Sequence, residues 1–397
     1  MDALCRVSPL TQRDRLRLYA CCFLVLVFDG IDVAVVPFLA PWMKSDSGFD
    51  NSLLTQVFLA TTVGFALGGI CIGHLADRYG RRPALIGSVA IFAVGSLLSP
   101  LSSAPDQFAA LRLLVGVGLG GALPVCIAWC TSAYSGCNRI LLTTLTYCGF
   151  TLGMALGAAL AKPLLGLMTW AQVIAVLGGA PLLAIPLMMA WLPKHSPIMQ
   201  GFENACVTPT LQRQTYTLRL WLAFCLSLMT FYLISYWLPV INTGLGLSPS
   251  LVILLPVGGT LGAVVFALLM QYYAAHNVLF AGYLAGALVT ASAWLILPHG
   301  VHLPWFIFLT GFFIAGCQNG LNIHAALAYP EHARTRFTGI VMSGGRVGAI
   351  AGVGVGGLML DSALPVELWI SVLSGGLLIV GICLKTVVVG QEIEGGA

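Results

Sequence analysis

Charged residues are scarce in this sequence. Asp, Glu, Lys and Arg together account for only 8% of the 397 residues, while hydrophobic residues account for 58%. An ordinary soluble domain carries about a quarter charged residues. The deficit excludes a soluble globular protein and indicates a chain that crosses a membrane many times.

The cysteine spacing that is typical of metal sites is missing. The chain has 12 cysteines, yet none forms a Cys-x-x-Cys pair, and most lie inside apolar segments. Small, polarizable cysteines in such places usually serve as packing residues. We therefore predict no metal site and no disulfide framework.

Apolar windows recur along the whole chain. Each is roughly 20 residues long, which is the length that spans the hydrocarbon core of a bilayer. Together they predict an all-α polytopic membrane protein with twelve transmembrane helices. The windows lie near residues 18–40, 53–75, 84–103, 107–131, 140–162, 171–193, 218–239, 250–273, 278–297, 303–327, 336–360 and 367–388.

Basic residues fall almost entirely on one side of these spans. Of the 18 Lys and Arg residues, 14 lie on that side, Lys44 and Lys162 lie on the other, and Arg112 and Arg346 lie within spans. The positive-inside rule places the basic side, and with it both termini, in the cytoplasm. The basic N-terminus resembles a signal peptide, but the apolar run after it is too long for one and contains two acids. We therefore interpret this run as the first span.

An internal duplication divides the chain near its midpoint. The polar stretch 194–217 is interpreted as a cytoplasmic connector between two six-helix bundles, residues 1–193 and 218–397. A shift of 194 residues superposes Gly68-Gly69 on Gly262-Ala263, and a shift of 195 superposes three glycines of span five on three of span eleven. Two parallel halves around a midplane site are typical of secondary transporters. The three glycine pairs, whose spacing predicts close helix packing, are Gly149, Gly153 and Gly157 with Gly344, Gly348 and Gly352.

Two aspartates, Asp29 and Asp32, lie in the middle of the first span. An acid at a bilayer centre costs about 2.5–3.5 kcal/mol on insertion scales, so the default interpretation is a proton or ion pathway. The two residues share a helix face. Two close carboxylates rarely ionise together, so one is expected to hold a proton near neutral pH. We predict Asp32 as the coupling site and Asp29 as its partner, although the two can titrate as one unit.

The loop after span two has the pattern Gly-x-x-x-Asp-Arg-x-Gly-Arg-Arg. It resembles the signature loop of the major facilitator superfamily, which implies a conformational latch between the halves of a transporter. The latch residues are then Gly73, Asp77, Arg78, Gly80, Arg81 and Arg82. The matching stretch of the second half, from Ala267 to Ala274, has lost its charges.

Span four opens with Arg112, followed by Gly116, Gly118 and Gly120. This resembles a second pattern of the superfamily, in which the arginine is tied to proton coupling. A buried guanidinium can keep an aspartate ionised or bind a substrate carboxylate through two hydrogen bonds. The alternative is that Arg112, which is only about a turn inside the membrane, extends to the nearer surface.

Within the superfamily, the chain is similar to the aromatic acid:proton symporters. The resemblance implies proton-coupled import of an aromatic carboxylate, of the hydroxybenzoate, protocatechuate or hydroxyphenylpropionate type, by alternating access across a bacterial inner membrane. It also implies that Asp29 and Asp32 are needed for transport. The family usually has an acid where this chain has Ala133, which removes a partner of the latch arginines. The similar blocks are Asp29 to Asp32, Pro37 to Pro41, Gly118 to Pro124, Tyr147 to Phe150, Tyr236 to Pro239, Gly316 to Asn322, Tyr329-Pro330 and Gly345 to Ile350.

Polar and aromatic residues of the second half are the candidates for binding the substrate. Arg346, which follows two glycines on span eleven, is the predicted anchor for the carboxylate. Gln318 and Asn322 share a face of span ten and suit hydrogen bonds to ring hydroxyls, with His324 as a minor candidate. On span seven, Tyr232 and Tyr236 are expected to stack on the aromatic ring. For these two tyrosines the alternative is packing or a place at the membrane interface.

These predictions define a transporter and not an enzyme. We expect protons as the coupling ion, no other cofactor, no nucleic-acid partner and a monomer in the lipid bilayer. The nearest alternative is proton-driven efflux of lipophilic compounds by the same superfamily, whose efflux members carry the same loop. A membrane enzyme would need a nucleophile–base pair or metal ligands near one membrane face. A nontransporting sensor would need an appended domain, whereas the tail after Lys385 is short.

Overall fold

The structure is a computed structural model of the chain. It describes residues 11–47, 49–102, 104–133, 138–193, 211–244, 248–293, 302–327, 331–362 and 365–387. Every regular element within these ranges is a helix. Eleven helical segments are long and apolar enough to cross a membrane, and α10 (Ala275–Ala291) is a shorter apolar helix. The predicted all-α polytopic membrane fold is therefore confirmed.

The helices follow the predicted spans in order. In the first half they are α1 (Gln12–Ser47), α2 (Asn51–Tyr79), α3 (Arg81–Leu98), α4 (Pro105–Ala133), α5 (Asn138–Leu164), and α6 (Trp170–Gly179), which continues through a 3₁₀ turn into α7 (Ile185–Trp191). In the second half they are α8 (Leu211–Gly244), α9 (Leu254–Tyr272), α10, α12 (Leu303–Leu327), α13 (Glu331–Asp361) and α14 (Val366–Val387). A short 3₁₀ helix, η3 (Pro249–Ile253), leads into α9.

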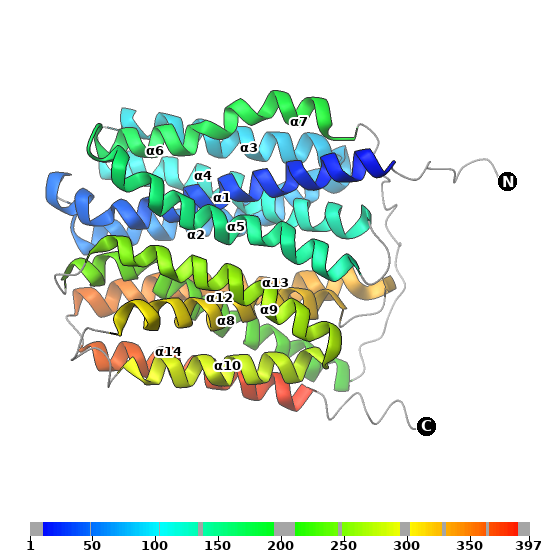
Figure 1. Ribbon diagram of the computed structural model, residues 1–397. Coiled ribbons are helices and arrows are strands. Elements are labelled where there is room, and N and C mark those ends of the chain that lie inside the picture. Colours follow the sequence, from blue (N-terminus) through cyan, green and yellow to red (C-terminus); the bar gives the residue numbers. More distant parts are fainter. Residues whose placement is uncertain are drawn as a thin grey trace, which may run out of the picture.

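The two groups of helices lie side by side as two bundles. Figure 1 shows α1 to α7 in the upper part of the molecule and α8 to α14 in the lower part. The start of α1 and the end of α14 lie at the same end of the helices. Helix α8 begins at Leu211, inside the stretch predicted as connector, while residues 194–210 lie outside the described residues.

Glycine contacts repeat from one half to the other. On α2, Gly64 and Gly68 lie against the backbone of α4, and 194 residues later Gly258 and Gly262 on α9 lie in the same way against α12. A side chain at any of these positions would overlap the neighbouring backbone, so only glycine permits the approach. The backbone positions they meet are Leu113, Val117, Phe308 and Phe312, respectively.

The second set of repeated contacts joins α5 to α1 and α13 to α8. The glycines of the predicted four-residue spacing all lie on these two interfaces, with their would-be Cβ atoms against the partner backbone. Each contacted position on α8 lies 198 residues after its counterpart on α1, and each glycine on α13 lies 195 residues after its counterpart on α5. The facing positions are Phe23, Val27 and Ile31 on α1, and Trp221, Cys225 and Met229 on α8. The duplication seen in the sequence thus corresponds to repeated helix packing.

Aromatic and hydroxyl side chains join the two halves. The Phe58 ring on α2 lies 4.9 Å from the Tyr236 ring and 5.3 Å from the Trp237 ring, both on α8. The hydroxyl of Thr260 on α9 donates to that of Thr151 on α5 at 2.7 Å. Helices α2 and α5 of the first half therefore contact α8 and α9 of the second.

Candidate transport site

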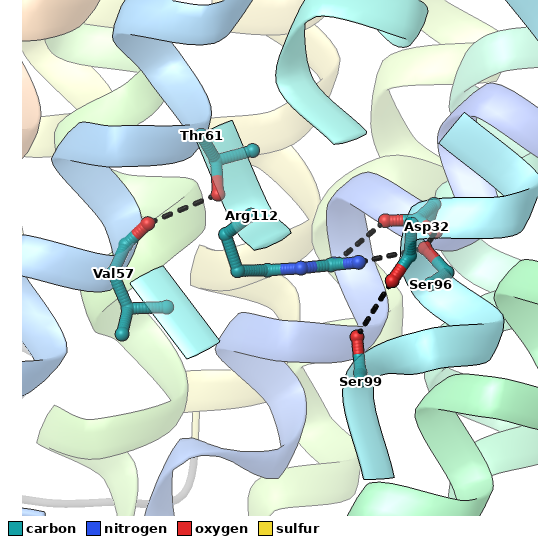
Figure 2. Close-up of polar contacts among 7 residues, drawn as sticks. Asp32, Val57, Thr61, Ser96, Ser99 and Arg112 are labelled. Carbon is teal, nitrogen blue, oxygen red and sulfur yellow. Dashed lines mark hydrogen bonds and ion pairs between the residues drawn. The ribbon is translucent and has the colours of Figure 1, made fainter. Parts of the chain in front are cut away.

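Asp32 forms a buried ion pair with Arg112 within the first half (Figure 2). The Arg112 Nη1 atom donates to Asp32 Oδ1 at 2.9 Å, and the two side chains are 1% and 2% exposed. Ser96 on α3 completes the group, because its hydroxyl accepts from Arg112 Nη2 at 2.6 Å and donates to Asp32 Oδ2 at 2.5 Å. Both Asp32 oxygens are thus engaged. In this structure Arg112 therefore binds an aspartate of its own half and does not extend to the membrane surface.

Helix α6 packs directly against Asp32 and Ser96. A Cβ atom at Gly178 would lie 2.5 Å from Asp32 Oδ2 and 2.7 Å from the Ser96 hydroxyl, so the glycine backbone lies directly against the pair. On the other side, the Phe108 ring lies 5.9 Å from the Arg112 guanidinium carbon. Ser96 and Gly178 are not among the predicted site residues, because a serine or glycine in an apolar span is usually a packing residue.

Asp29 lies one turn away on α1 in a different environment. It is 0% exposed, and neither of its carboxylate oxygens has a hydrogen-bond partner. The charges that act on it are those of Asp32, on its own helix, and Arg346, on α13 of the other half. Between the two acids, Gly30 lies against the backbone of Phe150 on α5, where any side chain would overlap. The Asp-Gly-x-Asp pattern therefore places two acids beside the closest approach of α1 and α5.

Arg346 extends from the second half toward the first. Its guanidinium carbon lies 5.5 Å from the centre of the Phe65 ring on α2. Its Nη2 atom would lie 3.7 Å from a Cβ at Gly69, so the absence of a side chain there leaves it room. A guanidinium that is only partly buried against one aromatic ring keeps donors for an anion.

Tyr147 on α5 is a site residue that the candidate set omitted. Its hydroxyl lies near the side chain of Asn322 on α12, and the charges of Arg346 and Asp29 both act on it. The same two charges act on Tyr232 on α8. The signal was in the sequence, because Tyr147 opens one of the blocks shared with the symporters, but no spacing rule connected it to the charges.

The two predicted ring-stacking tyrosines are already packed. The ring centres of Tyr232 and Tyr236 lie 5.5 Å apart, and the Tyr236 ring also contacts that of Phe58 in the first half. The Tyr236 hydroxyl lies near Thr62 on α2, and the charges of Arg112 and Asp32 act on it. Tyr236 is 2% exposed, so it links the halves beside the ion pair.

The remaining α12 candidates occupy different surroundings. Gln318 is buried and accepts a hydrogen bond from Ser227 on α8 at 2.5 Å. His324 lies nearer the end of the helix, where its electrostatic neighbour is His276 on α10 and its Nε2 atom has no partner. The structure therefore groups Asn322 with Tyr147, Arg346 and Asp29, and places His324 beside another helix.

The predicted latch residues contact helix ends within the first half. Gly80 forms the α2–α3 turn with φ +97°, a conformation that favours glycine. Arg81 donates to the carbonyl of Ala128 on α4 at 3.2 Å, Arg82 donates to the carbonyl of Met189 on α7, and the charge of Asp77 acts on Arg81. The Met189 carbonyl lies in the last turn of α7, where a cation is favourable, and Ala128 lies five residues before the end of α4. Arg78 lies over the ring of Tyr79, and a Cβ at Gly73 would meet nothing within 4 Å.

Duplicated helix packing with opposite charges near the place where the halves meet is typical of secondary transporters. The chain belongs to the major facilitator superfamily, whose model matches residues 22–322. It is 31% identical to a gallate transporter of Pseudomonas putida, over 89% of this chain and 87% of the relative. It is also 30% identical to a 4-hydroxybenzoate transporter of Pseudomonas aeruginosa (91% and 89% covered) and 32% identical to a 3-(3-hydroxy-phenyl)propionate transporter of Escherichia coli (89% of each). The protein is a membrane transporter and not an enzyme, as predicted.

Proposed function

We propose that this protein imports an aromatic carboxylate together with protons by alternating access. The relatives named for gallate, 4-hydroxybenzoate and 3-(3-hydroxy-phenyl)propionate support the substrate class. The single observation that carries the coupling is that Asp29 is buried without a hydrogen-bond partner, while the cation acting on it, Arg346, belongs to the opposite half. Import across a bacterial inner membrane, by a monomer with both termini cytoplasmic and no cofactor, completes the proposal.

The coupling follows from charge balance around Arg346. A buried carboxylate without hydrogen bonds is stable only as the neutral acid or beside a cation. Asp29 can ionise, and so balance Arg346, only while no substrate carboxylate is bound there. When the substrate carboxylate binds Arg346, it takes over that balance, and Asp29 must bind a proton. Substrate and proton therefore load together, and the site stays close to neutral as the halves move.

Asp32 has a different part in this proposal from the one predicted from sequence. Its two oxygens are engaged by Arg112 and Ser96, so losing its negative charge would leave a buried guanidinium uncompensated. Asp29 has no such partner. We therefore propose Asp29 as the residue that takes up and releases the proton, and the Asp32–Arg112 pair as a neutralised ion pair that stays intact through the cycle.

The experiment compares two transport modes in proteoliposomes that contain the purified full chain. Wild-type protein is expected to accumulate labelled 4-hydroxybenzoate under an inwardly directed proton gradient and also to exchange it across the membrane without a gradient. An Asp29→Asn variant, which is neutral at every pH, is expected to lose accumulation and retain exchange. Failure of wild-type protein to bind or move any aromatic acid would overturn the substrate class, and gradient-driven accumulation by the variant would overturn the role of Asp29.

Efflux is tested in the same preparation with the gradient reversed. The expected result is that lipophilic cations neither bind nor compete with 4-hydroxybenzoate, because an aromatic anion is what the Arg346 site accepts. Proton-driven extrusion of such compounds, without aromatic acid transport, would replace import by efflux.

A further inference from the structure

One face of α12 carries three carboxamides, those of Gln318, Asn319 and Asn322. Asn322 lies near Tyr147 on α5, so it faces the first half. At 3.6 residues per turn, Gln318 and Asn319 lie about 40° and 60° to either side of Asn322 around the helix. The three amides therefore share one face and span little more than one turn.

Two hydroxyls fix the orientation of Gln318. The Ser227 hydroxyl donates to Gln318 Oε1 at 2.5 Å and lies 2.7 Å from the hydroxyl of Tyr283 on α10. A serine hydroxyl has one proton, which Ser227 gives to Gln318, so Tyr283 donates to Ser227. This chain of donors leads from α10 through α8 to α12. It engages the amide oxygen of Gln318, so that the Nε2 donor points away from the two hydroxyls.

Three polar atoms on this face have no hydrogen-bond partner. They are Gln318 Nε2 and both polar atoms of the Asn319 amide. Gln318 is 4% exposed and Asn319 is 2% exposed. A buried polar group without a partner destabilises the folded state, which makes this a place where a polar ligand group is favoured.

We propose that Gln318 and Asn319 form a hydroxyl-binding subsite that makes the transporter select ring-hydroxylated aromatic acids over unsubstituted ones. The inference rests on the proposed function and adds a determinant of specificity to it. A phenolic hydroxyl both accepts and donates, so it can accept from Gln318 Nε2 and donate to Asn319 Oδ1. A carboxylate only accepts, so it binds Arg346 instead. Because the subsite is uncharged, it orients the ring without disturbing the charge balance at Asp29.

Discrimination arises because an acid without the hydroxyl leaves these amides unpaired. Sites built to hydrogen-bond a hydroxyl reject analogues that lack it far more strongly than apolar sites reject an extra group. Benzoate and 4-hydroxybenzoate have the same carboxylate and differ only in the hydroxyl. The ratio of their apparent affinities therefore reports on the subsite and is independent of Arg346.

The test measures competition of both acids against labelled 4-hydroxybenzoate exchange in proteoliposomes. Wild-type protein is expected to prefer 4-hydroxybenzoate by about tenfold or more, the effect of one to two buried hydrogen bonds. In Gln318→Leu and Asn319→Leu, which keep side-chain size, the ratio is expected to fall toward one through loss of 4-hydroxybenzoate affinity while benzoate affinity is kept. Thr310→Val is the matched control, because Thr310 is a buried hydroxyl without a partner on the same helix, and its ratio should equal that of wild type.

A further variant covers the case in which the leucine substitutions do not fold. Ser227→Ala removes the donor that orients Gln318, so the ratio is expected to fall about threefold, with near-normal benzoate binding. An unchanged ratio in the folded variants, or equal affinity of wild-type protein for the two acids, overturns the subsite and leaves the proposed function standing. Binding of neither acid by wild-type protein overturns the proposed function itself.

Discussion

The two halves of this transporter share their helix packing and differ in their charges. With the 198-residue offset between α1 and α8, Asp29 corresponds to Ser227 and Asp32 to Thr230. With the 195-residue offset of the other helices, Arg112 corresponds to Ile307, and Arg346 corresponds to Thr151. Glycines that set the backbone contacts are kept in both halves, while each charged group occurs in one half alone.

This difference separates two functions. The first half holds one neutralised ion pair and one acid without a hydrogen-bond partner, whereas the second half holds the arginine and the amide face. Opposite charges thus belong to bodies that are proposed to move relative to each other. A group that changes its charge partner when those bodies move can couple a proton to a substrate.

The largest effect is expected from removing the arginine of the ion pair in the first half. Arg112→Leu leaves Asp32 buried and unpaired, which costs about 3–5 kcal/mol of stability. The double variant Asp32→Leu/Arg112→Leu is expected to recover most of that stability, because both charges are gone, but not transport. Thermal unfolding in detergent and proton-driven uptake check the two expectations, with Ile307→Leu at the corresponding position of the second half as the control. A fully stable Arg112→Leu protein would contradict the ion pair.

The next effect comes from removing the charge of the second half. Arg346→Gln deletes charge-assisted hydrogen bonds worth about 1.5–3 kcal/mol, so the apparent KM for 4-hydroxybenzoate is expected to rise about 10- to 100-fold. Transport kinetics measure this, and Thr151→Val tests the corresponding position in the first half, where we expect little change. An equal rise in KM for both variants would remove the asymmetry between the halves.

A smaller effect is expected where α6 touches the ion pair. Gly178→Ala places a methyl group against Asp32 and Ser96, which costs about 1–3 kcal/mol and slows proton-driven uptake. The neighbouring Gly179→Ala places its methyl group 3.2 Å from the flexible Leu97 side chain, so it serves as the matched control. The prediction is checked by uptake and thermal unfolding, and it is wrong if the two variants behave alike.

The smallest effect is expected at glycines that contact nothing. A Cβ at Gly87 on α3 or at Gly375 on α14 would meet no atom within 4 Å. Alanine at either position is expected to raise helix stability by about 0.5–1 kcal/mol, equally in both halves. Thermal unfolding of the two variants measures this gain. A loss of stability in only one of the two variants would contradict the expectation that the two halves respond equally.

Much of the fold could be predicted because its signals are local. Apolar length defines the spans, and the glycine spacing of spans five and eleven predicted two interfaces that the structure contains. Pairing of Arg112 with an aspartate was one of the alternatives left open, because buried charges in a membrane need partners. The sequence offered no physical ground for the predicted choice of Asp32 over Asp29, because the two acids differ only in neighbours that come from α3, α4, α6 and α13.

The sequence by itself determined the membrane class, the duplicated helices and the residues that carry charge. Hydrophobic length, residue type and periodicity are properties of short segments, and they act whatever the rest of the chain does. Only the tertiary structure decided which acid is paired and which amides are left without partners. Ser96 and Gly178 reach Asp32, and Ser227 and Tyr283 orient Gln318, from helices distant in sequence. Such partners arise from packing, which no local pattern records.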